Sequence, residues 1–363
     1  MEGFTFSSGV EVANRLMLAP MTTSSGTESG GLSTEDVAFI LHRSKGFGAV
    51  ILGSHSVSPT GSAFSAGWNI YDSCNHAALT QLVKQLHHQK VKVFIQLYHA
   101  GRLAQPLFIG GRQPIAPSRI PAVRSFASYP KEMSMAEIKE IIQAFKKATE
   151  LAIRLGFDGV ELHGANTYLL QQFYSPHSNR RKDEWGGTRE RRLRFPLAVI
   201  RACQEAVNEC ATRPFLIGYR FSPEEYEVPG IRLEDTCFLL EQITKEGLDY
   251  VHVSLNDFRK QAQTGEQILP AIKEHVGDTP LIGCGNIRTH RDVDAVLQQV
   301  PLCSIGNAAV IDPDWAWKIL RGDHSIKSNL HVSEREQVKI PKPLWQTFLH
   351  NPLRYFLEEG TDE

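Results

Sequence analysis

Short apolar segments recur along the chain and alternate with segments of helical periodicity. The apolar segments are rich in β-branched residues and hold few polar positions, which is typical of parallel strands buried on both faces. Between them, apolar residues repeat at spacings of three and four, as they do from Leu79 to Leu86 and from Val293 to Val300, so helices are predicted there. Eight strands are predicted, at about residues 16–20, 49–53, 92–97, 158–162, 215–220, 249–254, 280–284 and 302–306.

The longest predicted helix has clear start and stop signals. Ser134 and Glu137 form a capping box, and Gly156 supplies a residue that readily adopts the left-handed conformation at a helix end. A strand followed by a helix, eight times over, indicates an α/β fold, a (β/α)8 TIM barrel. An open doubly wound sheet would show the same alternation, but the strand count favours the barrel.

Two connections are too long for simple turns. Residues 103–133, rich in proline and glycine, follow the third strand, and residues 163–188 follow the fourth. Long loops in a compact domain usually carry function, and barrel active sites form at the ends of strands that these loops follow. We therefore predict one barrel domain over residues 1–322. The tail, residues 323–363, has no strand pattern, and we expect it to pack on the barrel or on a partner subunit.

Composition and charge exclude several classes of function. The 39 Lys and Arg residues against 40 Asp and Glu residues leave a net charge of −1, which argues against a nucleic-acid-binding protein. The six cysteines form no CxxC or CxxxC pair, so neither a zinc site nor an iron–sulfur cluster is expected. No run of about 18 apolar residues or signal-peptide pattern is present, so we expect a soluble cytoplasmic protein without a membrane partner.

Polar residues stand at the C-terminal ends of most predicted strands. Taken alone, His163 is more typical of a structural histidine, and Arg220 of an ion-pair partner. Because the C-terminal ends of barrel strands meet at one face, the whole set indicates a ligand site. The set comprises Pro20, Met21 and Thr22 after the first strand, Ser54, Gln96, then His163, Asn166 and Tyr168, then Arg220, Gly285, Asn286, Gly306 and Asn307.

Each part of this set suits one part of a phosphate-bearing heterocycle and its substrate. Glycines and backbone N–H groups after the last two strands are the usual barrel phosphate site. Gln96 offers a donor and an acceptor to a heterocyclic edge, and Arg220 offers a fixed positive charge. His163 and Asn166, three residues apart on an expected helical turn, could direct two N–H donors at one oxygen, with Tyr168 nearby as a proton donor. These residues indicate FMN or another phosphate-bearing ligand.

At these positions the sequence resembles the Old Yellow Enzyme family of FMN-dependent ene-reductases. The matching segments are Asn14–Thr22, Gln96–Arg102 and Gly156–Asn166, together with a family hallmark that runs from Ser175 to Gly187. The resemblance extends from about residue 4 to residue 322. It implies a barrel, FMN as the cofactor, and NADPH or NADH as the reductant.

The resemblance also implies a role for each strand-end residue. Arg220 would lie beside flavin N1/O2, where negative charge accumulates on reduction, and would stabilise the reduced anion. Thr22 would lie near the N5/O4 edge, and Gln96 would bind the pyrimidine. The other implied contacts are Pro20, Met21 and Ser54 at the ring, and Gly285, Asn286, Gly306 and Asn307 at the phosphate.

The implied reaction is reduction of the C=C bond of α,β-unsaturated carbonyl or nitro compounds. NADH or NADPH would give hydride to flavin N5, and hydride would then pass from N5 to the β-carbon of the alkene. His163 and Asn166 would bind the carbonyl or nitro oxygen and stabilise charge that develops there in the transition state. Tyr168 would protonate the α-carbon; in the alternative reading it only packs against the substrate and water is the acid.

One position departs from the family pattern. The family usually has Gly-Arg after the eighth strand, with the arginine on the phosphate, whereas this chain has Gly306-Asn307. Loss of a charge-assisted contact is expected to weaken FMN retention. Arg288, two residues after Asn286, is a candidate replacement.

Three alternatives bear on this interpretation. A phosphate-site TIM-barrel lyase or isomerase without flavin would need a catalytic lysine or paired carboxylates at strand ends, but Glu161 falls inside the fourth strand. A flavin-binding barrel without ene-reductase activity stays open because of Asn307. A relative of dienoyl-CoA reductase or amine dehydrogenase is disfavoured because the cysteine cluster is missing. The sequence leaves open the physiological alkene, the choice between NADH and NADPH, and whether the chain forms a homo-oligomer.

Overall fold

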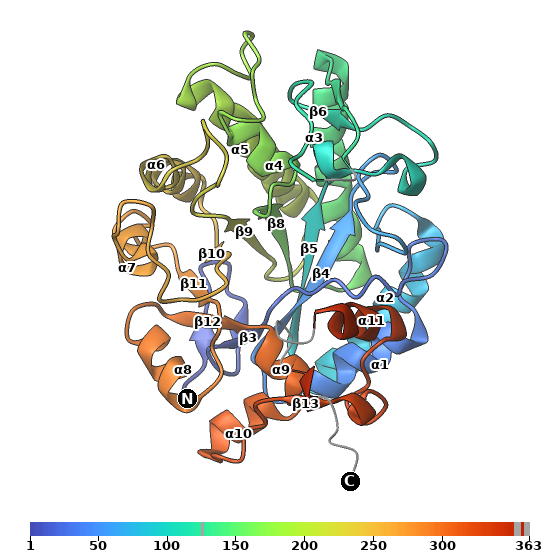
Figure 1. Ribbon diagram of the computed structural model, residues 1–363, viewed down its shortest axis with the longest axis vertical. Coiled ribbons are helices and arrows are strands. Elements are labelled where there is room, and N and C mark those ends of the chain that lie inside the picture. The colour runs from blue at the N-terminus through green and yellow to red at the C-terminus, as the bar shows by residue number, and fades with distance from the viewer. Residues whose placement is uncertain (125–126, 352–356, 359–363) are drawn as a thin grey trace.

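Eight parallel strands close into a barrel, in the order β10-β11-β12-β3-β4-β5-β8-β9 around the ring (Figure 1). The computed structural model describes residues 1–124, 127–351 and 357–358. All eight predicted strands are present, and the (β/α)8 barrel is confirmed. The strands are β3 (Leu16–Leu18), β4 (Ala49–Ser56), β5 (Lys92–Tyr98), β8 (Gly159–Gly164), β9 (Leu216–Phe221), β10 (Tyr250–Val253), β11 (Leu281–Cys284) and β12 (Leu302–Ile305).

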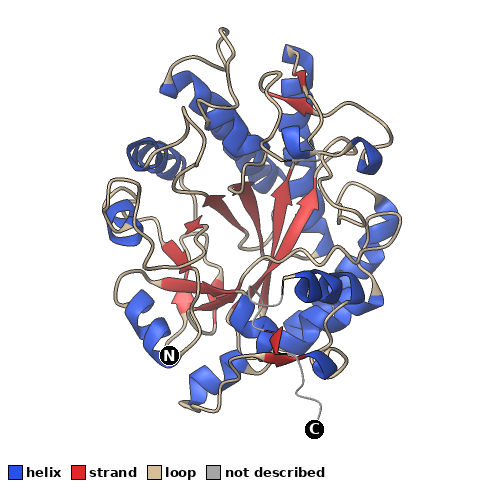
Figure 2. Cartoon of the chain, viewed as in Figure 1, coloured by secondary structure: helices blue, strands red, loops and turns tan. Residues whose placement is uncertain are grey.

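Helices surround the strands on the outside of the barrel (Figure 2). The predicted capping box is present: the Glu137 amide donates to Ser134 Oγ at 3.2 Å, and the Ser134 amide donates to Glu137 Oε2 at 2.8 Å. That helix ends at Gly156, whose φ is +92°. The helices are α1 (Thr34–Arg43), α2 (His76–His88), α3 (Met135–Leu155), α4 (Leu169–Tyr174), α5 (Arg189–Cys210), α6 (Leu233–Ile243), α7 (Ile268–Lys273), α8 (His290–Leu297), α9 (Asn307–Ile311), α10 (Trp315–Arg321) and α11 (Lys342–His350).

The inside of the barrel changes from apolar to polar along the strands. At the N-terminal end, an apolar cluster fills the barrel and is closed by residues of the hairpin β1 (Phe4–Thr5) and β2 (Glu11–Val12). Since side chains two residues apart on a strand face the same side, the next inward positions form a second layer nearer the C-terminal ends. The apolar cluster includes Met17, Ala49, Phe94, Leu216, Tyr250, Ile282 and Leu302, and the polar layer holds Gln96, Glu161, Arg220, His252, Cys284 and Ser304.

The two long loops carry short elements and are tied together. The loop after β5 contains the parallel pair β6 (Ile115–Ala116) and β7 (Lys131–Glu132). The loop after β8 contains α4, and beyond it Arg181 donates to the carbonyl oxygens of Pro117 and Met133 at 3.0 and 2.7 Å. These bonds fix the loops above the barrel, where the site lies.

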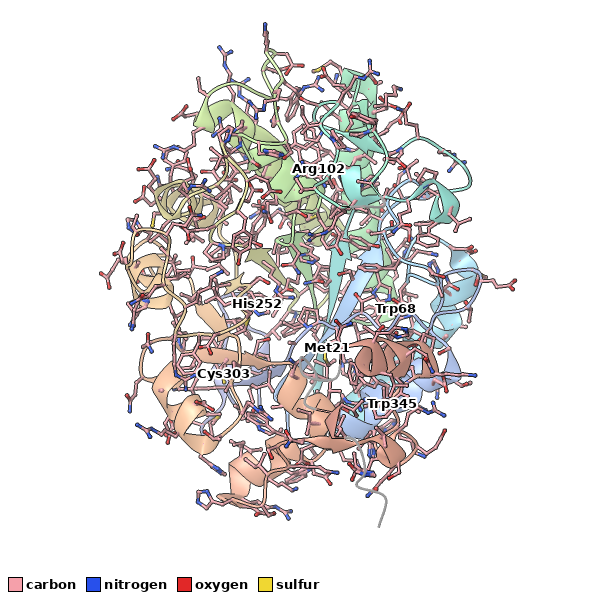
Figure 3. The ribbon with its side chains drawn as sticks, viewed as in Figure 1. Met21, Trp68, Arg102, His252, Cys303 and Trp345 are labelled. Atoms are coloured by element: carbon pink, nitrogen blue, oxygen red, sulfur yellow. The ribbon has the colours of Figure 1, made fainter. Side chains whose placement is uncertain are left out.

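The described residues after 322, up to residue 351, pack against helices of the same chain. The Arg43 guanidinium at the end of α1 donates to the Val338 carbonyl at 2.7 Å, and Trp345 and Phe348 of α11 are buried in the main core (Figure 3). A short strand, β13 (Leu330–His331), pairs with β14 (Leu357–Glu358), which the sequence pattern did not indicate. Among the described residues, no helix has both the length and the apolar character that crossing a membrane would require.

Candidate active site at the C-terminal ends of the strands

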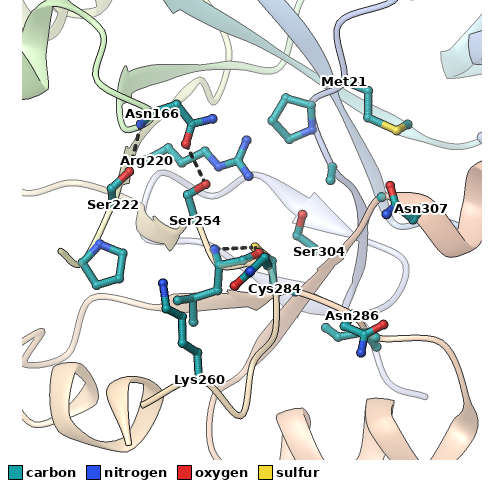
Figure 4. Close-up of a pocket in the computed structure, with 18 of the residues that line it drawn as sticks. Met21, Asn166, Arg220, Ser222, Ser254, Lys260, Cys284, Asn286, Ser304 and Asn307 are labelled. Carbon is teal, nitrogen blue, oxygen red and sulfur yellow. Dashed lines mark hydrogen bonds between the residues drawn. The ribbon is translucent and has the colours of Figure 1, made fainter. Parts of the chain in front are cut away.

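A cavity of about 860 Å³ opens at the C-terminal ends of the strands (Figure 4). Eight residues predicted from the sequence line it: Pro20, Met21, Asn166, Arg220, Gly285, Asn286, Gly306 and Asn307. Five predicted residues lie outside that lining: Thr22, Ser54, Gln96, His163 and Tyr168. The barrel therefore brings together strand ends that lie almost 300 residues apart in the sequence.

A chain of buried hydrogen bonds crosses the polar layer of the barrel. Ser54 Oγ donates to Gln96 Oε1 at 2.7 Å, and Gln96 Nε2 donates to Glu161 Oε1 at 2.7 Å. The other carboxylate oxygen, Oε2, contacts His252 Nδ1 at 2.8 Å and accepts from the Tyr250 hydroxyl at 3.1 Å. This series of hydrogen bonds fixes the Gln96 carboxamide. Glu161, which the sequence pattern placed inside a strand and not at the site, lies at its centre.

Glu161 and His252 form a buried ion pair. Burial by itself raises the pKa of Glu161, but the charge of His252 and the hydrogen bonds lower it to about 2. Burial lowers the pKa of His252, yet the attraction of Glu161 prevails and raises it. With Arg220 close to both, this layer carries one negative and two positive charges and suits an anionic ligand.

Several polar atoms of this layer are buried without a hydrogen-bond partner among the described residues. They are Arg220 Nε, His163 Nδ1, His252 Nε2 and Ser304 Oγ. Buried polar groups are nearly always paired, so a cluster of exceptions needs an explanation. A polar ligand in the adjoining cavity would supply the missing partners.

The expected helical turn between His163 and Asn166 is wrong. Strand β8 continues through Gly164, and Asn166 and Thr167 then adopt left-handed conformations with φ of +56° and +63°. Such values are uncommon for residues with a side chain and tend to occur at functional sites. The chain thereby turns sharply out of the barrel before α4 begins.

Asn166 is oriented by two serines. Its backbone N–H donates to Ser222 Oγ at 2.8 Å, and its Oδ1 accepts from Ser254 Oγ at 3.0 Å. Because the side-chain oxygen is engaged, the amide NH₂ group is the part available to donate into the cavity.

His163 is buried and neutral, since burial and the charge of Arg220 lower its pKa to about 3. Its ring lies 4.9 Å from the ring of Tyr168, which in turn lies 5.0 Å from the ring of Tyr98. Burial raises the pKa of Tyr168 far above its ordinary value, so the hydroxyl keeps its proton. Tyr168 thus belongs to an aromatic cluster beside His163.

The loops after β11 and β12 form the other end of the cavity. Gly285 has a φ of +111°, and a Cβ there would lie 2.8 Å from the backbone of residues 255 and 257. The Asn286 side-chain NH₂ group donates to Asp257 at 3.0 Å, which fixes the side chain at the edge of the cavity. Asn307 begins α9, and the first N–H groups of a helix have no partner within it.

Comparison with known proteins shows the family to which this chain belongs. Residues 2–325 match the model of the NADH:flavin oxidoreductase / NADH oxidase family. This chain belongs to that family. The resemblance to the Old Yellow Enzyme family is confirmed, because the matching family model is that of FMN-binding NADH:flavin oxidoreductases. A lyase or isomerase without flavin does not hold for a member of this family.

Individual relatives of this flavin oxidoreductase agree. The NADH:acrylate oxidoreductase of Vibrio harveyi is 42% identical over 95% of this chain, which spans 35% of that protein. The probable NADH-dependent flavin oxidoreductase YqiG of Bacillus subtilis (strain 168) is 37% identical over 96% of this chain and 95% of its own length. A structure of morphinone reductase in complex with tetrahydroNAD has a TM-score of 0.75 and 25% identity, over 87% of this chain and 89% of that one. The chain therefore spans about a third of its Vibrio relative but nearly all of the Bacillus one.

The described residues of this flavin oxidoreductase fit FMN. The cavity has a cationic side at Arg220, partnerless buried polar atoms next to it, and helix and loop N–H groups at the far end for a phosphate. Two basic side chains that line the cavity, Arg288 and Lys260, can add positive charge. The Arg288 guanidinium also donates to the Ser328 carbonyl, which orders it.

Sequence reasoning missed several lining residues of this flavin oxidoreductase. Ser222 follows β9 and Ser254 follows β10, so the strand-end rule that found Arg220 could have found both. Cys284 and Ser304 were missed because they sit one or two positions before the glycines that drew attention. Lys260 lies in a loop six residues beyond Ser254, and nothing in the sequence pattern singled it out.

Proposed function

We propose that this flavin oxidoreductase reduces the C=C bond of α,β-unsaturated carbonyl or nitro compounds, with NADH or NADPH as the electron source. The observation that carries the proposal is the position of Asn166 on the cavity that fits FMN, with its side-chain oxygen engaged and its NH₂ group free to donate. His163, uncharged and with Nδ1 unpartnered among the described residues, lies near the end of β8, the strand that precedes Asn166. A neutral donor pair suits an oxygen that gains charge during reaction, since it stabilises the transition state more than the ground state.

Asn166 and His163 bind the carbonyl or nitro oxygen of the alkene. Ser254 donates a hydrogen bond to the Asn166 side-chain oxygen. This bond holds the carboxamide in one orientation, with its NH₂ group ready to donate to the substrate. The low pKa of His163, about 3, keeps the ring neutral above acidic pH. We therefore expect substrate binding to change little between mildly acidic and basic pH.

Tyr168 delivers the proton that completes the reduction. Its raised pKa keeps the hydroxyl protonated, as a general acid requires, and the His163 ring packed at 4.9 Å places it next to the oxygen-binding pair. The proton goes to the α-carbon, from the side opposite to the incoming hydride. If water is the acid instead, Tyr168 contributes only packing.

Residues from both halves of the barrel hold FMN, which when bound supplies hydride chemistry at N5. Gln96, whose carboxamide is fixed by Ser54 and Glu161, binds the pyrimidine edge. Arg220 stabilises negative charge near N1/O2. The remaining contacts in this proposal are Pro20, Met21, Thr22 and Ser54 at the ring, and Gly285, Asn286, Gly306, Asn307 and Arg288 at the phosphate.

The substrate class is supported by one relative's name. Acrylate, for which the Vibrio relative is named, is an α,β-unsaturated carboxylate. Because this chain spans 35% of that protein, small unsaturated carboxylates are candidates to test beside enones and nitroalkenes, not an assignment.

Anaerobic titration tests the proposal. The FMN-loaded protein is reduced with NADH or NADPH, and then mixed with cyclohexenone, a nitroalkene or acrylate while flavin absorbance is followed. We expect reoxidation by at least one alkene, and loss of most of that rate in the double variant His163→Ala, Asn166→Ala, with reduction by the nicotinamide retained. A flavin that NAD(P)H reduces but no alkene reoxidises would favour a flavin-binding barrel without ene-reductase activity.

We also propose that residues 1–322 form the FMN-binding barrel and that residues 323–363 are an appendage on it. Burial of Trp345 and Phe348 in the core of the same chain supports packing on the barrel over packing on a partner subunit. We propose a cytoplasmic location, where the proposed reductants NADH and NADPH are available. Light scattering of the purified protein would show whether it forms a homo-oligomer.

A further inference from the structure

Cys284 ends β11 at the cavity, next to the Glu161–His252 ion pair. Its sulfur accepts a hydrogen bond from the Leu255 N–H at 3.4 Å (Figure 4), and its thiol donates to the Val253 carbonyl oxygen at 3.1 Å. The charge of His252, whose Nδ1 is held by Glu161, also acts on the thiol. A positive charge near a thiol favours the thiolate, which is the nucleophilic form of cysteine.

The surroundings of this thiol favour its ionised form. Burial raises the pKa of Cys284, but the interaction with His252, the charge of Arg220 and the Leu255 amide lower it to about 7. The ionisable groups around it are His252 and Tyr250 on β10, Arg220 on β9 and Glu161 on β8. On the other neighbouring strand, β12, its partner in register is the neutral Ser304.

Two other buried cysteines show that burial alone does not explain the lowered pKa of Cys284. Burial raises the pKa of Cys203 to about 12 and raises that of Cys303 further. Both sit in the apolar core outside the barrel wall, whereas Cys284 lines the cavity. Cys284 therefore differs in its charged neighbours and in its access to a ligand.

We propose that Cys284 is a covalent modification site, a nucleophilic thiol that electrophiles, activated alkenes among them, reach through the cavity when FMN is not bound. Because His252 is already protonated in its ion pair with Glu161, the thiol releases its proton to solvent. The thiolate sulfur then forms a bond to the β-carbon of the alkene while the C=C π bond breaks. The α-carbon takes up a proton from water, so the product is a neutral thioether and no oxidant or reductant is consumed. The site needs only the cavity and the electrophile, and so does not depend on the enzyme's reducing any alkene.

The adduct has a predictable consequence for the cofactor. Cys284 lines the same cavity as Arg220 and Gly285, so a group attached to its sulfur occupies space that FMN requires. Modification then prevents FMN binding, and bound FMN protects the thiol.

Alkylation of FMN-free and FMN-loaded full-length protein tests the proposal. Both forms are treated with iodoacetamide, which is not an alkene, and in parallel with N-ethylmaleimide, from pH 6 to pH 9. The modified peptides are quantified by mass spectrometry. In the FMN-free protein we expect Cys284 to react with a midpoint near pH 7, far faster than Cys203 or Cys303, and FMN to slow its reaction by about tenfold or more. The exposed Cys74 serves as the internal reference, since FMN does not cover it.

Two variants separate the thiol from its surroundings. In Cys284→Ser, FMN binding should become resistant to iodoacetamide; in His252→Asn, the midpoint for Cys284 should rise by about one pH unit while Cys74 is unchanged. If a variant does not fold, the wild-type peptide map still decides. Three outcomes would each overturn the proposal. Cys284 could react equally with and without FMN, or fail to react under conditions that label Cys74. Alternatively, Cys284 could be fully labelled while FMN binding is undiminished.

Discussion

The resemblance to the Old Yellow Enzyme family implies that Asn307 takes the place of an arginine on the flavin phosphate. Asn307 is exposed at the start of α9, on the lining of the cavity. Asn307→Arg should therefore add a charge-assisted contact and tighten FMN binding by about tenfold, as measured by fluorescence titration. Riboflavin, which has no phosphate, is the control ligand. An unchanged dissociation constant for FMN, or an equal gain for riboflavin, would contradict the phosphate assignment.

In the proposed mechanism, Tyr168 acts in alkene reduction but not in reduction of the flavin. Tyr168→Phe should lower the rate of alkene reduction by about 100-fold, since a positioned general acid contributes that much or more, while reduction of the flavin by NADH stays unchanged. Tyr98→Phe is the matched control, because Tyr98 is also buried and its ring lies 5.0 Å from that of Tyr168. Stopped-flow measurement of each half-reaction separates the two effects; an unimpaired alkene half-reaction in Tyr168→Phe would make water the acid.

At the scale of elements, the turn after β11 depends on a glycine. Gly285 has a φ of +111°, and a Cβ added there would lie only 2.8 Å from backbone atoms of the loop after β10. Gly285→Ala should displace this turn and weaken FMN binding by about tenfold or more. Gly110→Ala is the control, because Gly110 also has a positive φ but nothing lies within 4 Å of its added Cβ. If titration gives equal FMN affinities for both variants, the turn after β11 does not contribute to FMN binding.

Asp158 joins elements at the opposite end of the barrel. Its carboxylate contacts His87 Nε2 at 2.7 Å and accepts from the Val93 amide at 2.9 Å and from Arg213 at 3.1 Å. Burial raises its pKa, but these bonds and the charges of His87 and Lys92 lower it to about 2.

Because the pKa of Asp158 is depressed on folding, its stabilisation is present above the ordinary value of 3.8 and is lost as pH falls toward 2. Asp158→Asn should lower the free energy of unfolding by about 2 kcal/mol at pH 6, since its charged partners are partly exposed. Urea unfolding of both proteins should show that difference vanish near pH 2. The exposed Asp294→Asn is the control, and a difference that does not depend on pH would contradict the account.

The sequence predicts elements well where one physical rule decides them. Each barrel strand is a run of residues buried on both faces, and Ser134 and Gly156 mark the ends of α3 by local hydrogen bonding and φ alone. Asn166 shows the limit, because its left-handed turn depends on Ser222 and Ser254 from other strands. Glu161 and His252 could not be found for a related reason: which side of a strand faces the inside of the barrel is decided only when the barrel closes.

At the scale of the whole molecule, closure of the barrel turns scattered strand ends into one site. The near-zero net charge of the chain does not reveal this site, because the charges that act on a ligand are local. Arg220 and His252 lie near Glu161 in the polar layer, and Arg288 and Lys260 line the cavity proposed to hold the phosphate. The apolar cluster fills the N-terminal end of the barrel, and the polar layer lies toward the C-terminal ends of the strands. Polar chemistry is therefore confined to one end of the barrel.

Isotope tracing in a single turnover tests the central claim most directly. FMN-loaded protein is given nicotinamide deuterated at the transferable position, then one equivalent of an enone, without oxygen, and the product is examined by NMR. The account predicts deuterium at the β-carbon in ordinary water and, with unlabelled NADH in D₂O, deuterium at the α-carbon. Saturated product with deuterium from the nicotinamide at the α-carbon, or no saturated product from a flavin that NADH has reduced, would contradict it.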